Sequence, residues 1–171
     1  MAFCLSLAAC EKPSKDISFF NRNDLPAQTL INTEIIRSER GHLQVVIDAD
    51  LIEKYAEPRA KTIYPKGVNV TFFDESHKAK ALFRAGYAYS FDDVNEIHTR
   101  DSVVIIDYRS HDTVYLHELV WDSRQHRIWS DTTVRSVNGA RVTYGDSFES
   151  DDEFRMPIIT HQRGTLEWNG N

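Results

Sequence analysis

Apolar and polar side chains alternate along most of this chain. Between Gly41 and Leu51, apolar residues at positions 43, 45, 47, 49 and 51 alternate with mostly polar ones. Residues 81–91 repeat the pattern with alanine and aromatic side chains, and shorter stretches near 104–108 and 128–134 follow it too. A period of two places successive side chains on opposite faces of a strand. Aromatic and β-branched residues, which strands favour, are dense in these runs, so the pattern predicts an all-β protein.

Turn-forming residues separate the alternating runs. They occur at 65–67, 74–76, 122–124 and 145–146. Asn138-Gly139 lies between two apolar stretches and predicts a hairpin, because both residues tolerate positive φ. Residues 51–56 also fit a helical stripe, but Pro58 limits a helix there to a turn or two, so we expect a strand.

The charge of the chain bears on possible partners. Charged residues make up 27% of the 171 residues and the net charge is -6. Nucleic-acid binding requires a basic face that neutralises phosphates, so we expect no nucleic-acid partner. No stretch approaches the roughly 20 apolar residues that span a bilayer.

The N-terminus contains a possible lipidation signal. Leu7-Ala8-Ala9-Cys10 resembles a bacterial lipobox, in which the signal peptide is cut before a cysteine that is then acylated. Residues 1–9 then form the remnant of a signal peptide, 10–28 a lipidated N-terminus and tether, and 29–168 a single β-domain. The alternative is an apolar N-terminus with an unrelated cysteine.

Catalytic and metal-binding motifs are weak. The best metal-like group is His111, Asp112, His117 and Glu118, but on one strand His117 and Glu118 would point to opposite faces. The acidic runs at 92–93 and 151–153 are typical of solvated loops, and no nucleophile elbow or phosphate-binding loop occurs. We therefore expect no enzymatic activity, no cofactor and no metal. A catalytic group assembled only in space remains the alternative.

Several short motifs occur together in a fixed order between about residues 30 and 165. They are Tyr64-Pro65-Lys66-Gly67-Val68, Val70-x-Phe72-Phe73-Asp74, Ala85-x-Tyr87-Ala88, Asp101-Ser102-Val103-Val104, Leu116-x-x-x-x-Trp121-Asp122, Ile128-Trp129-Ser130-Asp131-Thr132-x-Val134 and Gly145-Asp146-Ser147-Phe148-x-Ser150-Asp151. In this order they resemble the LptC family, the periplasmic component of the lipopolysaccharide export system, in its Bacteroidetes-type lipoprotein form. The chain departs from the enteric members, which have a transmembrane helix where this chain has the lipobox. It also departs at Gly145, where a second glycine is expected nearby.

This resemblance implies a fold and a function. The fold is a single twisted, boat-like β-jelly roll of antiparallel strands with an apolar groove. The function is to receive lipopolysaccharide from an inner-membrane ABC transporter and pass it to a periplasmic bridge protein of similar fold. The protein would be held by its lipid anchor at the periplasmic face of the inner membrane. Sorting to the outer membrane is the alternative location.

The alternation phase and the strand edges give the expected site residues. The groove is expected to include Phe83, Tyr87, Val104, Ile106 and Ile128. An N-terminal edge with Leu30 and Ile31 would meet the transporter, and a C-terminal edge from Phe154 to Ile159, including Ile158, would meet the bridge protein.

A different class of function is the alternative. The chain would then be a periplasmic β-domain lipoprotein that binds glycan or acts as an assembly scaffold. Trp121 and Trp129, exposed on a convex face, would stack on sugars.

Overall fold

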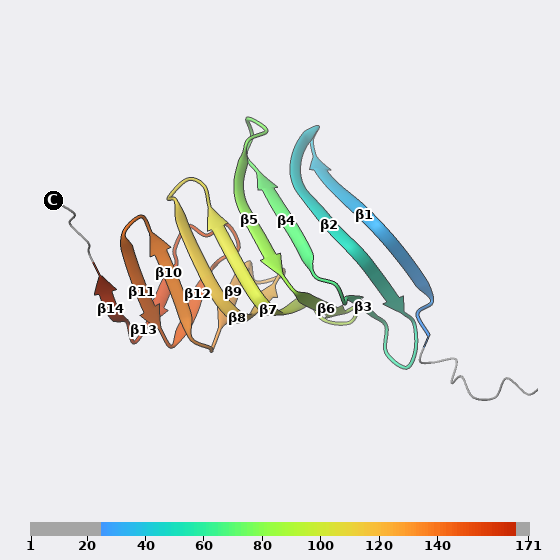
Figure 1. Ribbon diagram of the computed structural model, residues 1–171. Coiled ribbons are helices and arrows are strands. Elements are labelled where there is room, and N and C mark those ends of the chain that lie inside the picture. Colours follow the sequence, from blue (N-terminus) through green and yellow to red (C-terminus); the bar gives the residue numbers. More distant parts are fainter. Residues whose placement is uncertain (1–24, 167–171) are drawn as a thin grey trace, which may run out of the picture.

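The computed structural model describes residues 25–166, and every regular element in that range is a β-strand. Fourteen strands form one sheet in which all strand pairs are antiparallel (Figure 1). The strands are β1 (Gln28–Glu39), β2 (His42–Tyr55), β3 (Lys61–Tyr64), β4 (Val68–Phe73), β5 (Ala79–Ala85), β6 (Tyr87–Phe91), β7 (Glu96–Asp107), β8 (Asp112–Asp122), β9 (Arg127–Ser130), β10 (Val134–Asn138), β11 (Arg141–Gly145), β12 (Ser147–Asp151), β13 (Ile158–Thr160) and β14 (Arg163–Leu166). The all-β fold predicted from the alternation and the jelly-roll type implied by the resemblance are both confirmed.

Three long strands divide the sheet into two layers. The C-terminal part of β7 pairs with β5, whereas its N-terminal part pairs with β6. In the same way β8 pairs with β10 and β9, and β2 pairs with β4 and β3. The first layer therefore runs β14-β11-β10-β8-β7-β5-β4-β2-β1, and the second runs β13-β12-β9-β8-β7-β6-β3-β2-β1, because β1 pairs with β2 along both parts.

A close backbone contact marks the place where the chain crosses between the layers. Gly86, between β5 and β6, donates its N–H to the carbonyl of Asp101 at 2.7 Å. A Cβ at position 86 would lie 2.6 Å from that oxygen, so only glycine fits. Asp101 and Ser102 have φ of 64° and 59° and form an irregularity that bends β7 at this corner.

The core lies between the two layers. Side chains from both layers form one apolar cluster, and its members are Val68, Phe83, Ala85, Ala88, Val103, Ile105, Val114, Leu116, Leu119, Ile128, Val134 and Phe148. On β7, Val103 and Ile105 are 0% and 2% exposed, whereas Val104 and Ile106 are half-buried on the opposite face. The interior of the jelly roll is therefore an apolar space bounded by the two sheet layers.

Two local predictions can be compared with the strands. Residues 51–55 belong to β2, so the prediction of a strand there is confirmed. β10 and β11 form the predicted hairpin, but Asn138 pairs with Arg141 and the turn residues are Gly139 and Ala140, one position later than predicted. Gly139 has the positive φ, at 56°, that this turn requires. Cys10 and its lipobox lie outside the described residues.

Candidate functional site

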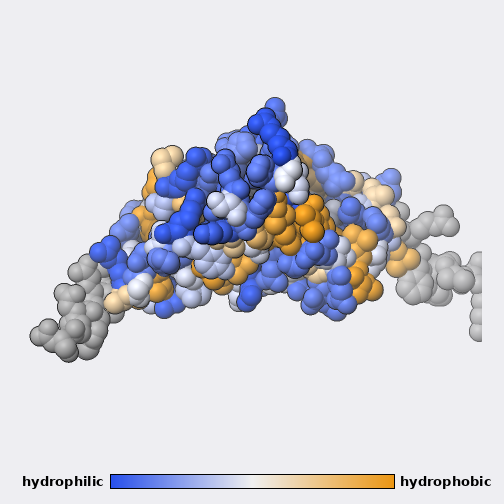
Figure 2. Space-filling model, turned by 90° about the horizontal axis from the view of Figure 1, so that it is seen from above, coloured by the Kyte–Doolittle hydropathy of each residue, from blue (hydrophilic) through white to orange (hydrophobic). Residues whose placement is uncertain are grey.

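An apolar cavity of about 150 Å³ lies between the two layers on the side of the N-terminal strands. Its lining comprises Arg37, Val45, Ile47, Tyr64, Val68, Val70, Phe72, Phe83, Ala88, Ile97, Thr99, Leu119, Trp121, Ile128, Asp152 and Phe154. Val45, Ile47 and Phe72 are only half-buried, so the cavity reaches the surface. Hydrophobic side chains show between hydrophilic ones on this side of the molecule (Figure 2).

Alternation in the strands explains why this space is apolar. β4 sends Val68, Val70 and Phe72 inward from the first layer, each two residues apart. From the second layer, β8 contributes Leu119 and Trp121 in the same way. Strands packed face to face fill such a space when their side chains interdigitate, so the cavity marks a region where the inner faces do not fully meet.

Few polar groups belong to the lining. The hydroxyl of Thr99 donates to the carbonyl of Leu119 at 2.9 Å and is therefore satisfied internally. Burial raises the pKa of Tyr64, which keeps its phenol neutral. The charged residues are Arg37, exposed at the irregular end of β1, and Asp152, whose carboxylate lies 3.0 Å from His126 Nδ1. Such a mostly apolar lining suits a hydrocarbon chain.

One polar atom in the wall is not satisfied. The indole N–H of Trp121 is buried and has no hydrogen-bond partner within the described part of the chain. A buried donor left unpaired costs about 1–3 kcal/mol.

Two of the five predicted groove residues line the cavity. Phe83 and Ile128 belong to the lining and are 9% and 3% exposed. Tyr87 was placed wrongly, because the chain changes layer at Gly86 and the alternation changes phase there: Ala88, not Tyr87, points inward.

Val104 and Ile106 were also placed wrongly. Val103 and Ile105 are the buried residues of this part of β7, so Val104 and Ile106 lie on the outer face. The run Val103-Val104-Ile105-Ile106 is apolar on both faces, so its hydropathy alone does not fix which face is buried.

A row of aromatic side chains covers the outer face of the second layer. Tyr89 packs against Tyr87 and Phe91, with ring centroids 6.2 and 5.8 Å away, and stacks on His98 at 5.0 Å. The guanidinium of Arg100 lies 4.4 Å from the Tyr87 ring. Sequence reasoning missed this row, although Tyr87-x-Tyr89-x-Phe91 is itself the period-two signal of one shared face.

The two tryptophans expected on a convex face, Trp121 and Trp129, lie in different places. Trp121 lines the cavity, so its expected exposure on the convex face was wrong. Trp129 pairs across the outer face with Val120 and Glu149, and the guanidinium of Arg127 lies 5.1 Å from its ring. Of the two, only Trp129 remains available to a ligand on the outer face.

The sheet edges carry three of the four predicted edge residues. Leu30 and Ile31 belong to β1, which within residues 25–166 pairs with β2 alone, and Ile31 is 70% exposed. Ile158 is 56% exposed on β13, which pairs with β12 at the end of the second layer. Phe154 is not in an edge strand: it lies in the turn between β12 and β13 and points into the cavity.

Other classes of site receive no support from the described residues. No group of three or more His, Cys, Asp or Glu side chains among residues 25–166 is placed to hold a metal ion. His117 and Glu118 are both exposed, at the place where the buried positions of β8 shift from Leu116 to Leu119. The described part of the chain contains no helix that is long and apolar enough to span a membrane.

Comparisons with known proteins leave the family of the chain open. No protein-family model matches it, and no curated protein sequence matches it significantly.

Proposed function

We propose that the protein transports lipopolysaccharide across the periplasm of a Gram-negative bacterium, with acyl chains held between the two layers. The observation that carries this proposal is the apolar interlayer cavity that reaches the surface. An acyl chain in water costs roughly 0.8 kcal/mol for each methylene, so a dozen carbons cost roughly 10 kcal/mol. A jelly roll with an unfilled apolar interior removes most of this cost and leaves the sugars in solvent.

The size of the cavity indicates how a chain would enter. A cavity of about 150 Å³ lined by apolar side chains holds a molecule of about the size of benzene. A long acyl chain therefore needs the layers to separate, or a side chain to move, beyond the described arrangement. The half-buried lining residues on the open side, such as Val45 and Phe72, are those that move with least loss of packing.

The edges of the two layers fit partners that add strands. β1 at one end and β13 at the other present unpaired backbone groups within the described chain, together with the exposed side chains of Ile31 and Ile158. Edge strands pair readily with a strand of another protein. We propose that β1 meets the inner-membrane ABC transporter and β13 the periplasmic bridge protein, with acylated Cys10 as the membrane anchor. Energy would come from the transporter, and the protein itself would catalyse no reaction.

Site-specific photocrosslinking in living cells tests this function. A photoreactive residue at Phe83 or Ile128 should capture lipopolysaccharide, because both side chains line the cavity. The matched control is Val104, which lies on the outer face of the strand that pairs with Phe83's strand. Capture from Val104 but not from Phe83 would contradict the proposal, as would normal outer-membrane lipopolysaccharide after depletion of the protein.

The outer aromatic row favours a second candidate, the binding of glycan. Aromatic side chains such as Tyr87 and Trp129 can stack on sugar rings, and Arg100 beside Tyr87 would bind an acidic group. Arg127, beside Trp129, is already paired with Glu149. Crosslinking at Trp129 separates the candidates: glycan captured there, with no lipid captured from Phe83, would favour this function.

A further inference from the structure

The interior between the layers contains a second, smaller cavity of about 20 Å³. Its lining comprises Ile105, Asp107, Ser110, Asp112, Val114, Phe148, Phe154 and Pro157. Among the described residues, Phe154 alone lines both this space and the main cavity. The Phe154 ring is therefore the partition between two compartments of one interlayer space.

Phe154 reaches this position from a turn. It lies between β12 and β13, with a φ of 57°, a conformation that bulky residues adopt only rarely. Its N–H donates to the carbonyl of Asp151 at 3.1 Å, and its ring packs edge-on against Phe72 with centroids 6.2 Å apart. The backbone thus adopts a costly conformation that places an aromatic ring between the layers.

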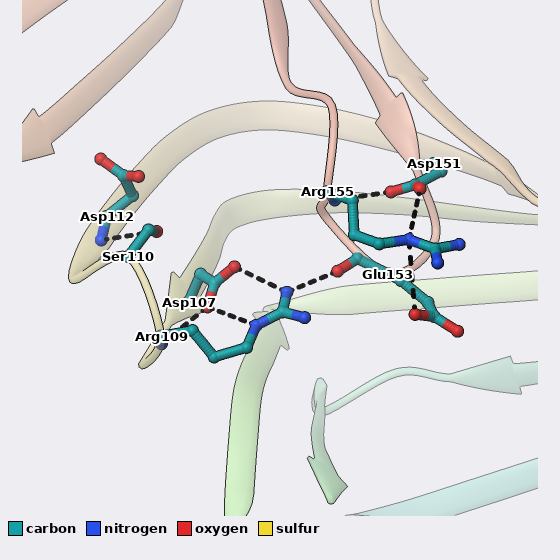
Figure 3. Close-up of polar contacts among 7 residues, drawn as sticks. All are labelled: Asp107, Arg109, Ser110, Asp112, Asp151, Glu153 and Arg155. Carbon is teal, nitrogen blue, oxygen red and sulfur yellow. Dashed lines mark hydrogen bonds and ion pairs between the residues drawn. The ribbon is translucent and has the colours of Figure 1, made fainter. Parts of the chain in front are cut away.

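Two arginines fasten this turn (Figure 3). Arg109, in the turn after β7, donates from Nη2 to the carboxylate of Asp107 at 2.8 Å and to the carbonyl of Glu153 at 2.6 Å. Arg155 donates from Nε to the carboxylate of Asp151 at 3.0 Å. The turn that carries Phe154 is therefore attached to the β7–β8 end of the first layer as well as to its own strand.

Because these contacts lie partly in solvent, they resist displacement of the Phe154 ring less than buried packing would. The contacts that hold the turn are polar and partly exposed, since the Arg109 and Arg155 side chains are 42% and 63% exposed. The ring itself is only half-buried, so it gives up limited packing when it moves. Displacement of the ring would join the main cavity to the space beside Ile105 and Phe148.

We propose that Phe154 determines the specificity of the groove, because its ring ends the main compartment and limits the length of acyl chain that the protein holds. This inference rests on the proposed function, since it assumes that the main cavity receives acyl chains. It identifies the residue that limits the length of the bound acyl chain, and it predicts that a smaller side chain at position 154 lengthens the preferred acyl chain.

A binding series with straight-chain fatty acids of about 8, 12 and 18 carbons tests the inference on the purified protein. Each additional buried methylene strengthens binding about fourfold, so a chain that extends by two methylenes past position 154 gains roughly fifteenfold. We expect Phe154→Ala to bind the longest acid about fifteenfold more tightly than the unmodified protein, with the shortest acid unchanged. Phe154→Leu, a milder change that keeps the fold if the alanine variant does not, should shift the preference in the same direction by less.

Tyr64→Ala is the matched control. Tyr64 is a half-buried aromatic residue that lines the main cavity but not the smaller one. Its removal enlarges the first compartment without joining it to the second, so it should not favour the longest acid selectively. If the unmodified protein binds the acids but both Phe154 variants keep its chain-length preference, the inference is overturned and the proposed function stands. If the unmodified protein binds none of the acids, the proposed function fails, and the inference fails with it.

Discussion

The interlayer space has an open half and a closed half, and both are built from the same two layers. In the open half, around the main cavity, Val45, Ile47 and Phe72 are only half-buried. In the closed half, toward β10 and β12, Val134 and Phe148 are 0% and 2% exposed, and the space beside Phe148 is only about 20 Å³. Interior packing at full density stabilises a domain, whereas unfilled apolar surface does not. The contrast indicates that the closed half supplies more of the stability than the open half.

Substitution of one phenylalanine in each half gives the largest expected difference. Phe148→Ala should lower the free energy of unfolding by about 3–5 kcal/mol, since it removes a fully buried ring. Phe72→Ala should cost only about 1–2 kcal/mol, because its ring is half-buried and borders a space that already exists. Urea denaturation measures both values. Equal losses would show that the open half is packed as firmly as the closed one.

Period-two alternation predicted which residues of β5 are buried, but it did not predict the change of phase where the chain crosses between the layers. Ala81, Phe83 and Ala85 alternate as expected and are buried. The same alternation, continued through Gly86, placed Tyr87 on the wrong face. A glycine inside an alternating run signals a close backbone approach. Its effect on phase depends on Asp101, which is distant in sequence, so the local pattern did not reveal it.

Phe154 shows why the candidate site was predicted only in part. Asp151-Asp152-Glu153-Phe154-Arg155 reads as a charged turn or an edge, and no periodicity extends through it. The aromatic residue among charges was the one available signal that the turn has an inward-facing anchor. The partner of that anchor, Phe72, lies on a strand far away in sequence, and only the fold brings them together.

The corner beside the open half provides the second prediction. Gly86→Ala should lower the free energy of unfolding by about 1–3 kcal/mol, because the new Cβ would meet the Asp101 carbonyl oxygen at 2.6 Å. Gly41→Ala is the control: its Cβ would meet no atom within 4 Å, so its cost of about 1 kcal/mol comes from the positive φ of 83° alone. Thermal or urea unfolding of both variants separates steric from conformational cost. If Gly86→Ala were the milder change, the corner would not be the rigid junction between the layers.

The contact between Asp107 and Arg109, which holds the turn of Phe154 at the boundary between the halves, gives the smallest expected effect on stability. This effect depends on pH. Burial of Asp107 opposes its ionisation, but hydrogen bonds from the side chain and backbone of Arg109 outweigh this effect and lower the pKa of Asp107 below its usual value. The stability that this carboxylate contributes is therefore fully present above its unfolded pKa of about 3.9 and is lost as pH falls through the lower folded value.

Asp107→Asn should therefore destabilise the protein by about 1–2 kcal/mol at neutral pH, since it weakens the charged hydrogen bonds that hold Arg109 and, through it, the turn of Phe154. The difference from the unmodified protein should shrink below about pH 4. Urea denaturation at both pH values measures this. Asp93→Asn is the control, because its pair with Arg59 is exposed and should change stability little at either pH. A pH-independent loss in Asp107→Asn would mean that the side chain acts by its shape. The partition between the two halves would then not depend on its charge.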